Sequence, residues 1–155
     1  MTVDVKLAST EHKPHLKSLL TEYLSELSGY GEVDYAYPYF EAYWEEVETR
    51  WPYLVLRADQ CVGFAFVNKW SPSGRGTDYS MAEFYIIPDA RGCAIGRDAA
   101  KAVLQAHSGQ WELSVMRQNA PAHKFWPSAI KAAEAEDLVQ IASGAGTIYR
   151  FAIYR

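Results

Sequence analysis

The sequence predicts one domain of the α/β (α+β) class, with a mixed, mostly antiparallel central sheet of about six to seven strands flanked by about four helices. Three observations support this prediction. Segments in which apolar and polar residues alternate interchange with segments whose apolar residues recur at helical spacing. Residues 53–70 and 137–154 each contain two strand-like segments around a short turn, as antiparallel hairpins do. Residues 81–117 follow the order strand, loop, helix, strand, which is typical of a right-handed crossover.

The first elements are a strand and two helices. Residues 2–8 alternate in polarity like a half-buried strand, and leucines at helical spacing follow until Gly29 and Gly31 end the helix. Apolar residues at helical spacing over residues 40–47 predict a second helix before Pro52.

The next two segments form the predicted hairpin. Residues 53–58 and 61–70 are rich in β-branched and aromatic residues and are joined by the turn Asp59-Gln60. Residues 71–78 are mostly turn formers, which predicts an exposed loop.

The second half begins with a strand over residues 81–87, a helix that Gly109 closes, and a strand over residues 110–117. A further helix opens at residue 119, and Pro127 is expected to break it into two pieces because proline lacks a backbone donor. Two strands, 137–143 and 147–154, complete the chain around the turn 144–146.

The composition excludes several classes of protein. Of 155 residues 49% are apolar, which is too many for a disordered chain. A net charge of −4 argues against binding nucleic acid, and no apolar run is long enough to span a membrane. The start of the chain lacks the features of a signal peptide, so we expect a cytoplasmic protein. Cys61 and Cys93 match no zinc-ligand spacing, and we expect neither a disulfide nor a metal.

Residues 90–100, ARGCAIGRDAA, lie between a predicted strand and a predicted helix. Small residues there allow the backbone to approach a ligand closely, and the free N–H groups of a helix start bind anions. Arg91 and Arg97 can add charge-assisted hydrogen bonds to phosphate oxygens. By themselves these residues are a weak signal, because such short strings recur by chance and a glycine-rich turn before a surface helix would look the same.

Together with residues 119–126, NAPAHKFW, this loop resembles the GNAT superfamily of acetyltransferases. The family's phosphate loop follows Arg/Gln-x-x-Gly-x-Gly/Ala, and its next crossover ends in Asn-x-x-Ala-x-x-Phe/Tyr-Tyr. The close match covers residues 81–127. The matching positions are Arg91, Ala94 and Gly96 in the first pattern and Asn119, Ala122, Phe125 and Trp126 in the second.

The resemblance implies an N-acetyltransferase that uses acetyl-CoA as acyl donor and no metal. Asn119 would bind the pantetheine arm, although it is equally suited to cap a helix, and a backbone N–H near Ile86 or Ile87 would polarise the thioester carbonyl. The expected cofactor-binding set also contains the loop that holds the pyrophosphate, and the aromatic residue of the second pattern: Arg91, Gly92, Cys93, Ala94, Ile95, Gly96, Arg97 and Phe125.

Two positions depart from the family pattern. Ala94 replaces a glycine, which is a mild change if its φ angle is negative. Trp126 stands where the family usually has a tyrosine that protonates the leaving thiolate. An indole cannot act as a general acid, so Trp126 is expected to pack or to form a pocket wall.

Glu83 is the residue expected to accept a proton, because direct attack on a thioester requires a neutral amine. On a central strand, with Phe84, Tyr85 and Trp70 as expected neighbours, its carboxylate can have a raised pKa. The alternative is an ordinary solvated or paired glutamate. His107 and His123 are less suited, since both are expected on helix surfaces.

Residues 22–48 contain eight acidic residues interleaved with aromatic ones and neither lysine nor arginine. Carboxylates and aromatic faces attract cations, so the expected partner is a small cationic amine. Solvated helix faces over an aromatic core would give the same pattern. The residues expected to bind the acceptor are Tyr30, Tyr35, Tyr85 and Trp126.

Two other functions remain open. One is a catalytically silent acyl-CoA-binding or sensor domain. The other, a nucleotide-binding module, lacks a P-loop lysine and a Rossmann acidic residue at the required spacing. The sequence also leaves a homodimer open.

Overall fold

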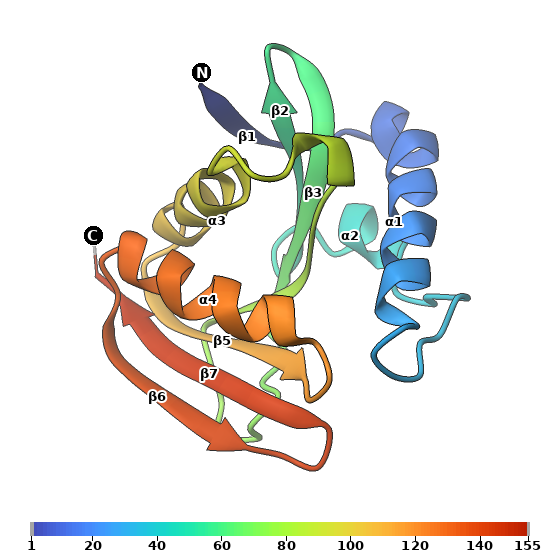
Figure 1. The fold of residues 1–155 in the computed structure, drawn as a ribbon. Coiled ribbons are helices and arrows are strands. Elements are labelled where there is room, and N and C mark those ends of the chain that lie inside the picture. Colours follow the sequence, from blue (N-terminus) through green and yellow to red (C-terminus); the bar gives the residue numbers. More distant parts are fainter. Residues whose placement is uncertain (1, 155) are drawn as a thin grey trace.

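The computed structural model describes residues 2–154, and in this range the chain forms one seven-stranded sheet with four α-helices around it (Figure 1). The strand order is β1-β2-β3-β4-β5-β7-β6, and β4 with β5 is the parallel pair among antiparallel neighbours. The predicted sheet and its flanking helices are therefore confirmed. The elements are β1 (Val3–Leu7), η1 (Thr10–His12), α1 (Lys13–Leu27), α2 (Ala42–Glu45), β2 (Trp51–Arg57), β3 (Gln60–Asn68), β4 (Tyr79–Ile86), η2 (Pro88–Ala90), α3 (Ile95–Gln105), β5 (Gly109–Met116), α4 (Ala120–Ala132), β6 (Glu136–Ala142) and β7 (Gly146–Ile153).

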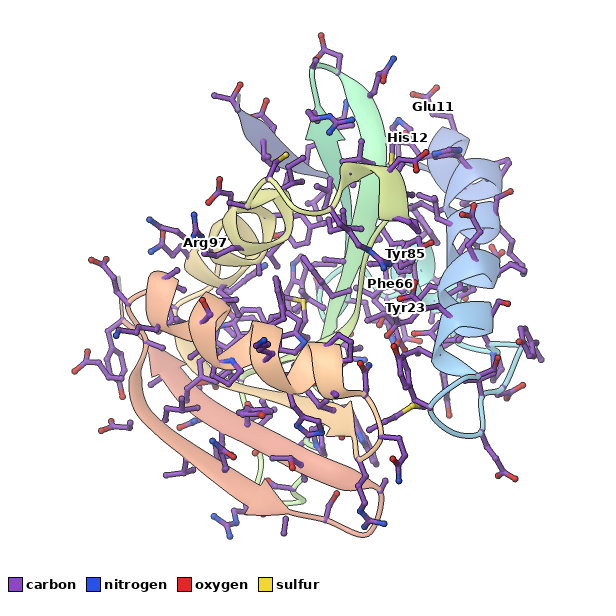
Figure 2. The ribbon with its side chains drawn as sticks, in the orientation of Figure 1. Glu11, His12, Tyr23, Phe66, Tyr85 and Arg97 are labelled. Carbon is purple, nitrogen blue, oxygen red and sulfur yellow. The ribbon has the colours of Figure 1, made fainter. Side chains whose placement is uncertain are left out.

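The helices form a layer on each face of the sheet. Leu20 of α1 packs with Phe66 of β3 in one apolar cluster, to which the α2 region also contributes. On the other face, Val103 of α3 and Ile130 of α4 pack with Trp111 of β5. Figure 2 shows side chains filling both layers, with Tyr23, Phe66 and Tyr85 between α1 and the sheet. Burial of these apolar faces is the main stabilising term for such a sandwich of layers.

The sheet opens between β4 and β5. Only two residue pairs join these strands, Tyr79 with Trp111 and Ser80 with Glu112. Beyond them the strands diverge (Figure 1), whereas β3 follows β4 along its length. The edge of β4 that faces β5 is therefore free of a partner strand from Met81 to Ile86, and this opening defines the site.

Each predicted hairpin turn differs by one residue in the structure. Ala58 and Asp59, not Asp59 and Gln60, connect β2 to β3, since Gln60 already pairs with Arg57. Both turn residues have positive φ, +50° and +65°, as a two-residue type I′ turn requires. In the second hairpin Ser143 and Gly146 exchange backbone hydrogen bonds, so the turn is residues 144–145.

Two helix predictions were wrong in detail. The helix expected over residues 40–47 is only the four-residue α2, because the chain leaves helical geometry at Glu46 and Val47 is 64% exposed. Pro127 does not break α4, which runs without interruption from Ala120 to Ala132. Packing of Trp126 and Ile130 into the core offsets the backbone hydrogen bond that the proline removes. None of the helices within residues 2–154 has the length and apolar character to cross a membrane.

Candidate active site

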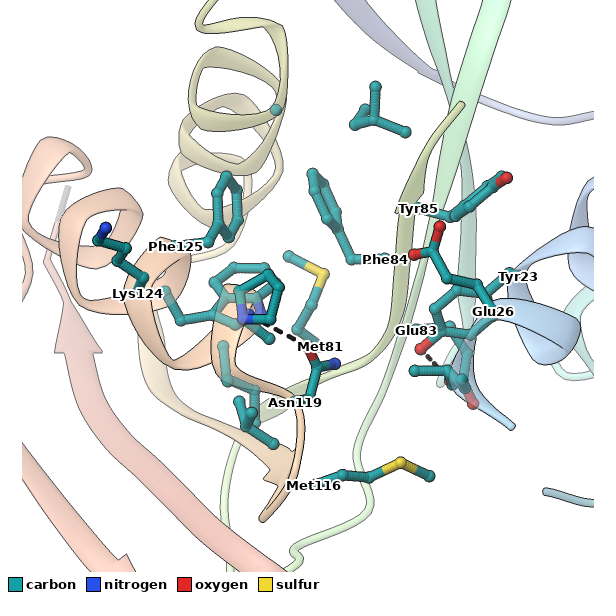
Figure 3. Close-up of a pocket in the computed structure, with 18 of the residues that line it drawn as sticks. Tyr23, Glu26, Met81, Glu83, Phe84, Tyr85, Met116, Asn119, Lys124 and Phe125 are labelled. Atoms are coloured by element: carbon teal, nitrogen blue, oxygen red, sulfur yellow. Dashed lines mark hydrogen bonds between the residues drawn. The ribbon is translucent and has the colours of Figure 1, made fainter. Parts of the chain in front are cut away.

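A cleft of about 990 Å³ lies where β4 and β5 diverge (Figure 3). Its walls come from both strands, the start of α3, one side of α4 and the C-terminal half of α1. Twelve of the residues expected from the sequence to form the site line this cleft: Tyr30, Glu83, Tyr85, Ile86, Arg91, Gly92, Ala94, Gly96, Arg97, Asn119, Phe125 and Trp126.

A second cavity of about 980 Å³ meets the cleft at Glu83. The two cavities share residues of β4 and β5, including Met81 and Ser114, so they join through the opening of the sheet. The second cavity is bounded by the segment between α1 and α2 and by the loop after β3. A ligand in the cleft and another in the second cavity could therefore meet beside Glu83.

The loop before α3 has the geometry of an anion site. Gly92 has φ +93°, and the first N–H groups of α3 have no partner within the helix. A Cβ on Gly96 would lie 3.1 Å from Cε1 of Phe125, so glycine lets α3 and α4 approach without displacing that ring. Ala94 has φ +61° and lies in the left-handed region. The condition under which this replacement of glycine would be mild, a negative φ, is therefore not met, and the alanine carries strain that a glycine would not.

Arg91 ties this loop to α1. Its Nη2 lies 2.9 and 3.1 Å from the carboxylate oxygens of Glu26, and its Nε donates to the Ile86 carbonyl at 2.8 Å. Arg97 is half-exposed and its closest acidic contact, to Asp98, is 3.8 Å. Arg97 therefore has more donors available for a phosphate than Arg91 has.

The backbone of β4 presents one N–H to the cleft at its end. The Ile87 N–H donates to the Val62 carbonyl of β3, so it faces away from the cleft. The Ile86 carbonyl faces the opposite way, toward Arg91, and in a strand the N–H of the same residue points to the same side. Of the two candidates for the thioester, Ile86 therefore directs its N–H toward the cleft.

Asn119 lies where it caps a helix and also borders the cleft, as both of its expected roles require. Its Oδ1 accepts a hydrogen bond from the Ala122 N–H at 3.2 Å, which caps α4, and the residue also lines the cleft. Phe125 of α4 stacks on Phe84 of β4, with ring centroids 5.7 Å apart (Figure 3). Trp126 packs edge-on to both rings and is 7% exposed. These aromatic contacts join α4 to β4 across the opening.

Glu83 lies on the side of β4 that faces α1. The Tyr23 hydroxyl donates to Oε1 at 2.8 Å, and the Tyr37 hydroxyl donates to Oε2 at 2.9 Å. Burial raises the pKa of Glu83 to about 7, and the two hydrogen bonds act against that rise. A carboxyl group with this pKa can both accept and release a proton near neutral pH.

Four residues expected at the site do not line the cleft with their side chains. Tyr35 is 55% exposed and lies outside both cavities. Ile95 is buried beneath the start of α3, and Cys93 is exposed in the loop. Ile87 packs in the core clusters on either side of β4.

The two histidines are placed away from the cleft. The His107 Nε2 lies 2.7 Å from the Tyr53 hydroxyl, and the ring is half-buried against Trp51 and Trp111 rather than on the surface. Burial lowers the pKa of His107. The His123 ring contacts the Met116 carbonyl.

Only some of the acidic residues in the segment 22–48 line the second cavity. Glu26, Glu41 and Glu46 form ion pairs with Arg91, Lys13 and Arg50, as the solvated-surface alternative predicts. Glu32 and Asp34 line the second cavity together with Glu83.

Sequence reasoning missed Tyr23, Tyr37 and Lys124. Tyr23 falls at helical spacing among the buried leucines of α1, and a hydroxyl on a buried face needs a polar partner, so a signal was present. Lys124 lines the cleft from the exposed side of α4 and adds a positive charge. Across residues 2–154, no three His, Cys, Asp or Glu side chains cluster in a way that could hold a metal ion.

Comparison with known proteins agrees with this geometry. Residues 15–128 match the model of the acetyltransferase (GNAT) family. A search of curated protein sequences found no match.

Three solved structures illustrate the similarity of fold. An acetyltransferase from Thermus thermophilus is 15% identical with a TM-score of 0.66, over 97% of this chain and 96% of that one. The PaiA N-acetyltransferase from Thermoplasma acidophilum, in complex with coenzyme A, is 13% identical with a TM-score of 0.64, over 99% and 100%. The aminoglycoside acetyltransferase AAC(6')-Ib, in complex with coenzyme A and kanamycin, is 14% identical with a TM-score of 0.68, over 99% and 95%.

Proposed function

Because the chain belongs to the acetyltransferase (GNAT) family, we propose that it transfers the acetyl group of acetyl-CoA to a small cationic amine by direct attack in a ternary complex. The observation that carries this proposal is the meeting of two cavities at Glu83, inside the opening between β4 and β5. One cavity begins at the anion-binding loop and the other at an acidic and aromatic wall.

In the proposed reaction the carbonyl carbon of the thioester forms a bond to the amine nitrogen, and its bond to sulfur breaks. The acceptor nitrogen loses a proton to the Glu83 carboxylate, directly or through water. The sulfur leaves as a thiolate and takes a proton from water or from the Tyr85 hydroxyl, since Tyr85 lines the cleft and the indole of Trp126 cannot supply one. The products are an acetamide and free coenzyme A.

The acyl donor would be held by residues of the first cavity. The N–H groups at the start of α3, with Arg97 and Lys124, suit the pyrophosphate. Asn119 suits the pantetheine amides, and the Ile86 N–H suits the thioester oxygen. When bound, acetyl-CoA supplies the activated acetyl group, and no residue of the chain needs to become acetylated.

The acceptor would occupy the second cavity, although Tyr30, Tyr85 and Trp126, which the sequence suggested for this role, line the first cavity instead. Glu32, Asp34 and Glu83 outnumber Arg50, the cation that lines it, and Trp70 adds an aromatic ring. The Tyr39 ring already lies against the Arg50 guanidinium. Kanamycin, which is bound to one of the structurally similar acetyltransferases, is a polycation of this kind. The acceptor class proposed for this chain therefore follows from the charge of the cavity.

Ligand-induced stabilisation tests the donor site. Acetyl-CoA at about 100 times its Kd should stabilise the fold by about 2.7 kcal/mol. Gly96→Glu should abolish this gain, because its side chain would enter the loop region and meet Phe125. Gly144→Glu is the matched control, since a Cβ there meets nothing within 4 Å. A wild-type melting temperature that does not respond to acetyl-CoA would refute the proposal.

An amine panel tests the acceptor. Spermidine and kanamycin, which are polycations, should be acetylated with a higher kcat/KM than tyramine, a monocation, and glutamate, which is anionic, should be the poorest acceptor. Added salt should reduce these differences. Equal turnover of anionic and cationic amines would contradict the proposed acceptor class. Binding of acetyl-CoA without turnover of any amine would favour the silent acyl-CoA-binding domain. A cytoplasmic location and a homodimer stay predictions.

A further inference from the structure

Two tyrosines from outside the sheet hold the carboxylate of Glu83. Tyr23 comes from α1, and Tyr37 comes from the segment that joins α1 to α2. Each donates its hydroxyl proton to a different carboxylate oxygen, at 2.8 and 2.9 Å. The plane of the carboxylate is therefore fixed from two directions.

The Tyr37 hydroxyl has a further polar neighbour in Tyr43. The hydroxyl of Tyr37 gives its one proton to Glu83, and the hydroxyl of Tyr43 interacts with Tyr37 and accepts a hydrogen bond from Asn68 Nδ2 at 3.3 Å. Because Asn68 supplies a donor to Tyr43, the Tyr43 proton is free to be directed toward Tyr37. Polar groups linked in this way strengthen one another.

Packing prevents these rings from turning away. The Tyr23 ring meets Phe64 edge-on at 5.6 Å between centroids, and the Tyr43 ring stacks on Phe66 at 4.3 Å. The Tyr37 ring also lies against Phe66. The donors are therefore preorganised before any substrate binds.

We propose that Tyr23 and Tyr37 are positioning residues for the acetyl transfer, which orient the Glu83 carboxylate for proton acceptance from the amine. This inference rests on the proposed function. Tyr37 and Glu83 both line the second cavity, so the oriented carboxylate faces the space assigned to the acceptor. Neither tyrosine needs to touch the reacting atoms.

The two hydrogen bonds also keep the carboxylate available as a base. Burial raises the pKa of Glu83 to about 7, and both tyrosines favour the ionised form. Loss of one donor should raise this pKa further, so that less carboxylate is ionised at neutral pH. The titratable groups that interact with the carboxylate are Tyr23 of α1, Tyr37 of the connecting segment and Tyr43 of α2. Glu26 lies near Tyr23 and Arg50 near Tyr43, and Glu32 and Asp34 line the second cavity together with Glu83.

Titration of Glu83 by NMR tests the proposal without any substrate. In protein labelled with ¹³C at the glutamate carboxyl carbons, the signal that Glu83→Gln removes identifies Glu83. Tyr23→Phe and Tyr37→Phe should each move its midpoint up by about one pH unit, since a hydrogen bond to a charged group contributes roughly that much. Tyr43→Phe should cause a smaller shift in the same direction.

Tyr53→Phe is the matched control, because it removes a tyrosine hydroxyl that is bonded to His107, away from both cavities. It should leave the Glu83 midpoint unchanged. Unchanged midpoints in folded Tyr23→Phe and Tyr37→Phe proteins would overturn the proposal.

Turnover separates this inference from the proposed function. Turnover is measured with the best acceptor among spermidine, kanamycin and tyramine. In Tyr23→Phe and Tyr37→Phe, the midpoint of the acidic limb of the kcat/KM–pH profile should rise by the same number of pH units that NMR records. A shifted NMR midpoint with an unmoved limb would overturn the positioning role. If the wild type acetylates none of these amines, the proposed function fails, whereas the NMR midpoints still decide whether the tyrosines orient Glu83.

Discussion

The hydroxyl of Tyr23 and Oε1 of Glu83 lie 2.8 Å apart, although 60 positions separate the two residues in the chain. This contact joins α1 to β4 at the point where the two cavities meet. It places a buried carboxylate and its donor beside the space that a substrate would enter.

Replacement of Glu83 by glutamine tests its proposed role as base. We expect kcat to fall by about 10²- to 10⁴-fold, the usual contribution of general acid–base catalysis, with acetyl-CoA affinity nearly unchanged. The loss should shrink as pH rises, because more of the amine is then neutral without help. Glu136→Gln, at an exposed position of β6, serves as control. Wild-type kcat at pH 7 in Glu83→Gln would assign the proton to another group or to water.

The same replacement should stabilise the fold at high pH. Because the pKa of Glu83 is raised to about 7 in the folded protein, folding binds a proton there, and stability falls as pH rises from the ordinary glutamate pKa of about 4.3 toward 7. Glutamine carries no charge and escapes this loss. The melting temperature of Glu83→Gln relative to wild type should thus increase by a few degrees between pH 4.5 and pH 8. A difference that stays constant over this range would mean that the carboxyl group is not perturbed.

Ala94→Gly should stabilise the protein by about 1 kcal/mol, because glycine adopts the φ of +61° without the steric conflict of a Cβ. Ala102→Gly is the matched control. It makes the same change inside α3, where glycine should destabilise by roughly 0.5–1 kcal/mol. Urea unfolding of both variants measures whether each change raises or lowers the free energy of unfolding. Destabilisation by both would show that Ala94 is not strained.

Glu112→Gln should destabilise the fold by about 1.5–3 kcal/mol, the worth of hydrogen bonds to a charged group. Glu112 is fully buried and accepts hydrogen bonds from the Ser71 hydroxyl, from the Ser73 N–H and hydroxyl, and from Arg150. Burial raises the pKa of Glu112, but these hydrogen bonds outweigh it and lower the pKa overall. The carboxylate therefore anchors the loop after β3.

The stability that Glu112 contributes depends on pH in the opposite direction to that of Glu83. A lowered pKa means that the contribution is complete above the ordinary glutamate pKa of about 4.3 and is lost as pH falls below it. The melting temperatures of wild type and Glu112→Gln should therefore converge in acid. If the melting temperatures of the two proteins differ by a constant amount down to pH 3, the Glu112 carboxylate does not stabilise the fold in this way.

Trp126→Phe should retain kcat within about tenfold, because an indole cannot act as a general acid, whose loss would cost 10²-fold or more. The ring packs against Phe84 and Phe125, so its truncation should lower stability by about 1 kcal/mol. Both kcat and melting temperature should be measured. A thousandfold loss of kcat in a folded variant that binds acetyl-CoA normally would give the indole a direct part in the reaction.

The sequence by itself determined the order of strands and helices, the small-residue loop between a strand and a helix, and the position of Glu83 on a central strand. These features depend on local periodicity and on motifs within a few residues, which short-range physics controls. Two local features of the backbone did not follow from the sequence, because contacts between distant elements decide them. The unbroken helix at Pro127 depends on burial of its neighbours, and the positive φ of Ala94 depends on how the loop joins β4 to α3.

Only the tertiary structure decided what surrounds Glu83. The divergence of β4 from β5 opens the space, and α1 and the segment after it bring Tyr23 and Tyr37 to the carboxylate. Tyr35, in the same aromatic segment as Tyr37, remains exposed. No local pattern distinguishes these two tyrosines, because which hydroxyl reaches a buried carboxylate depends on the packing of distant elements against one another.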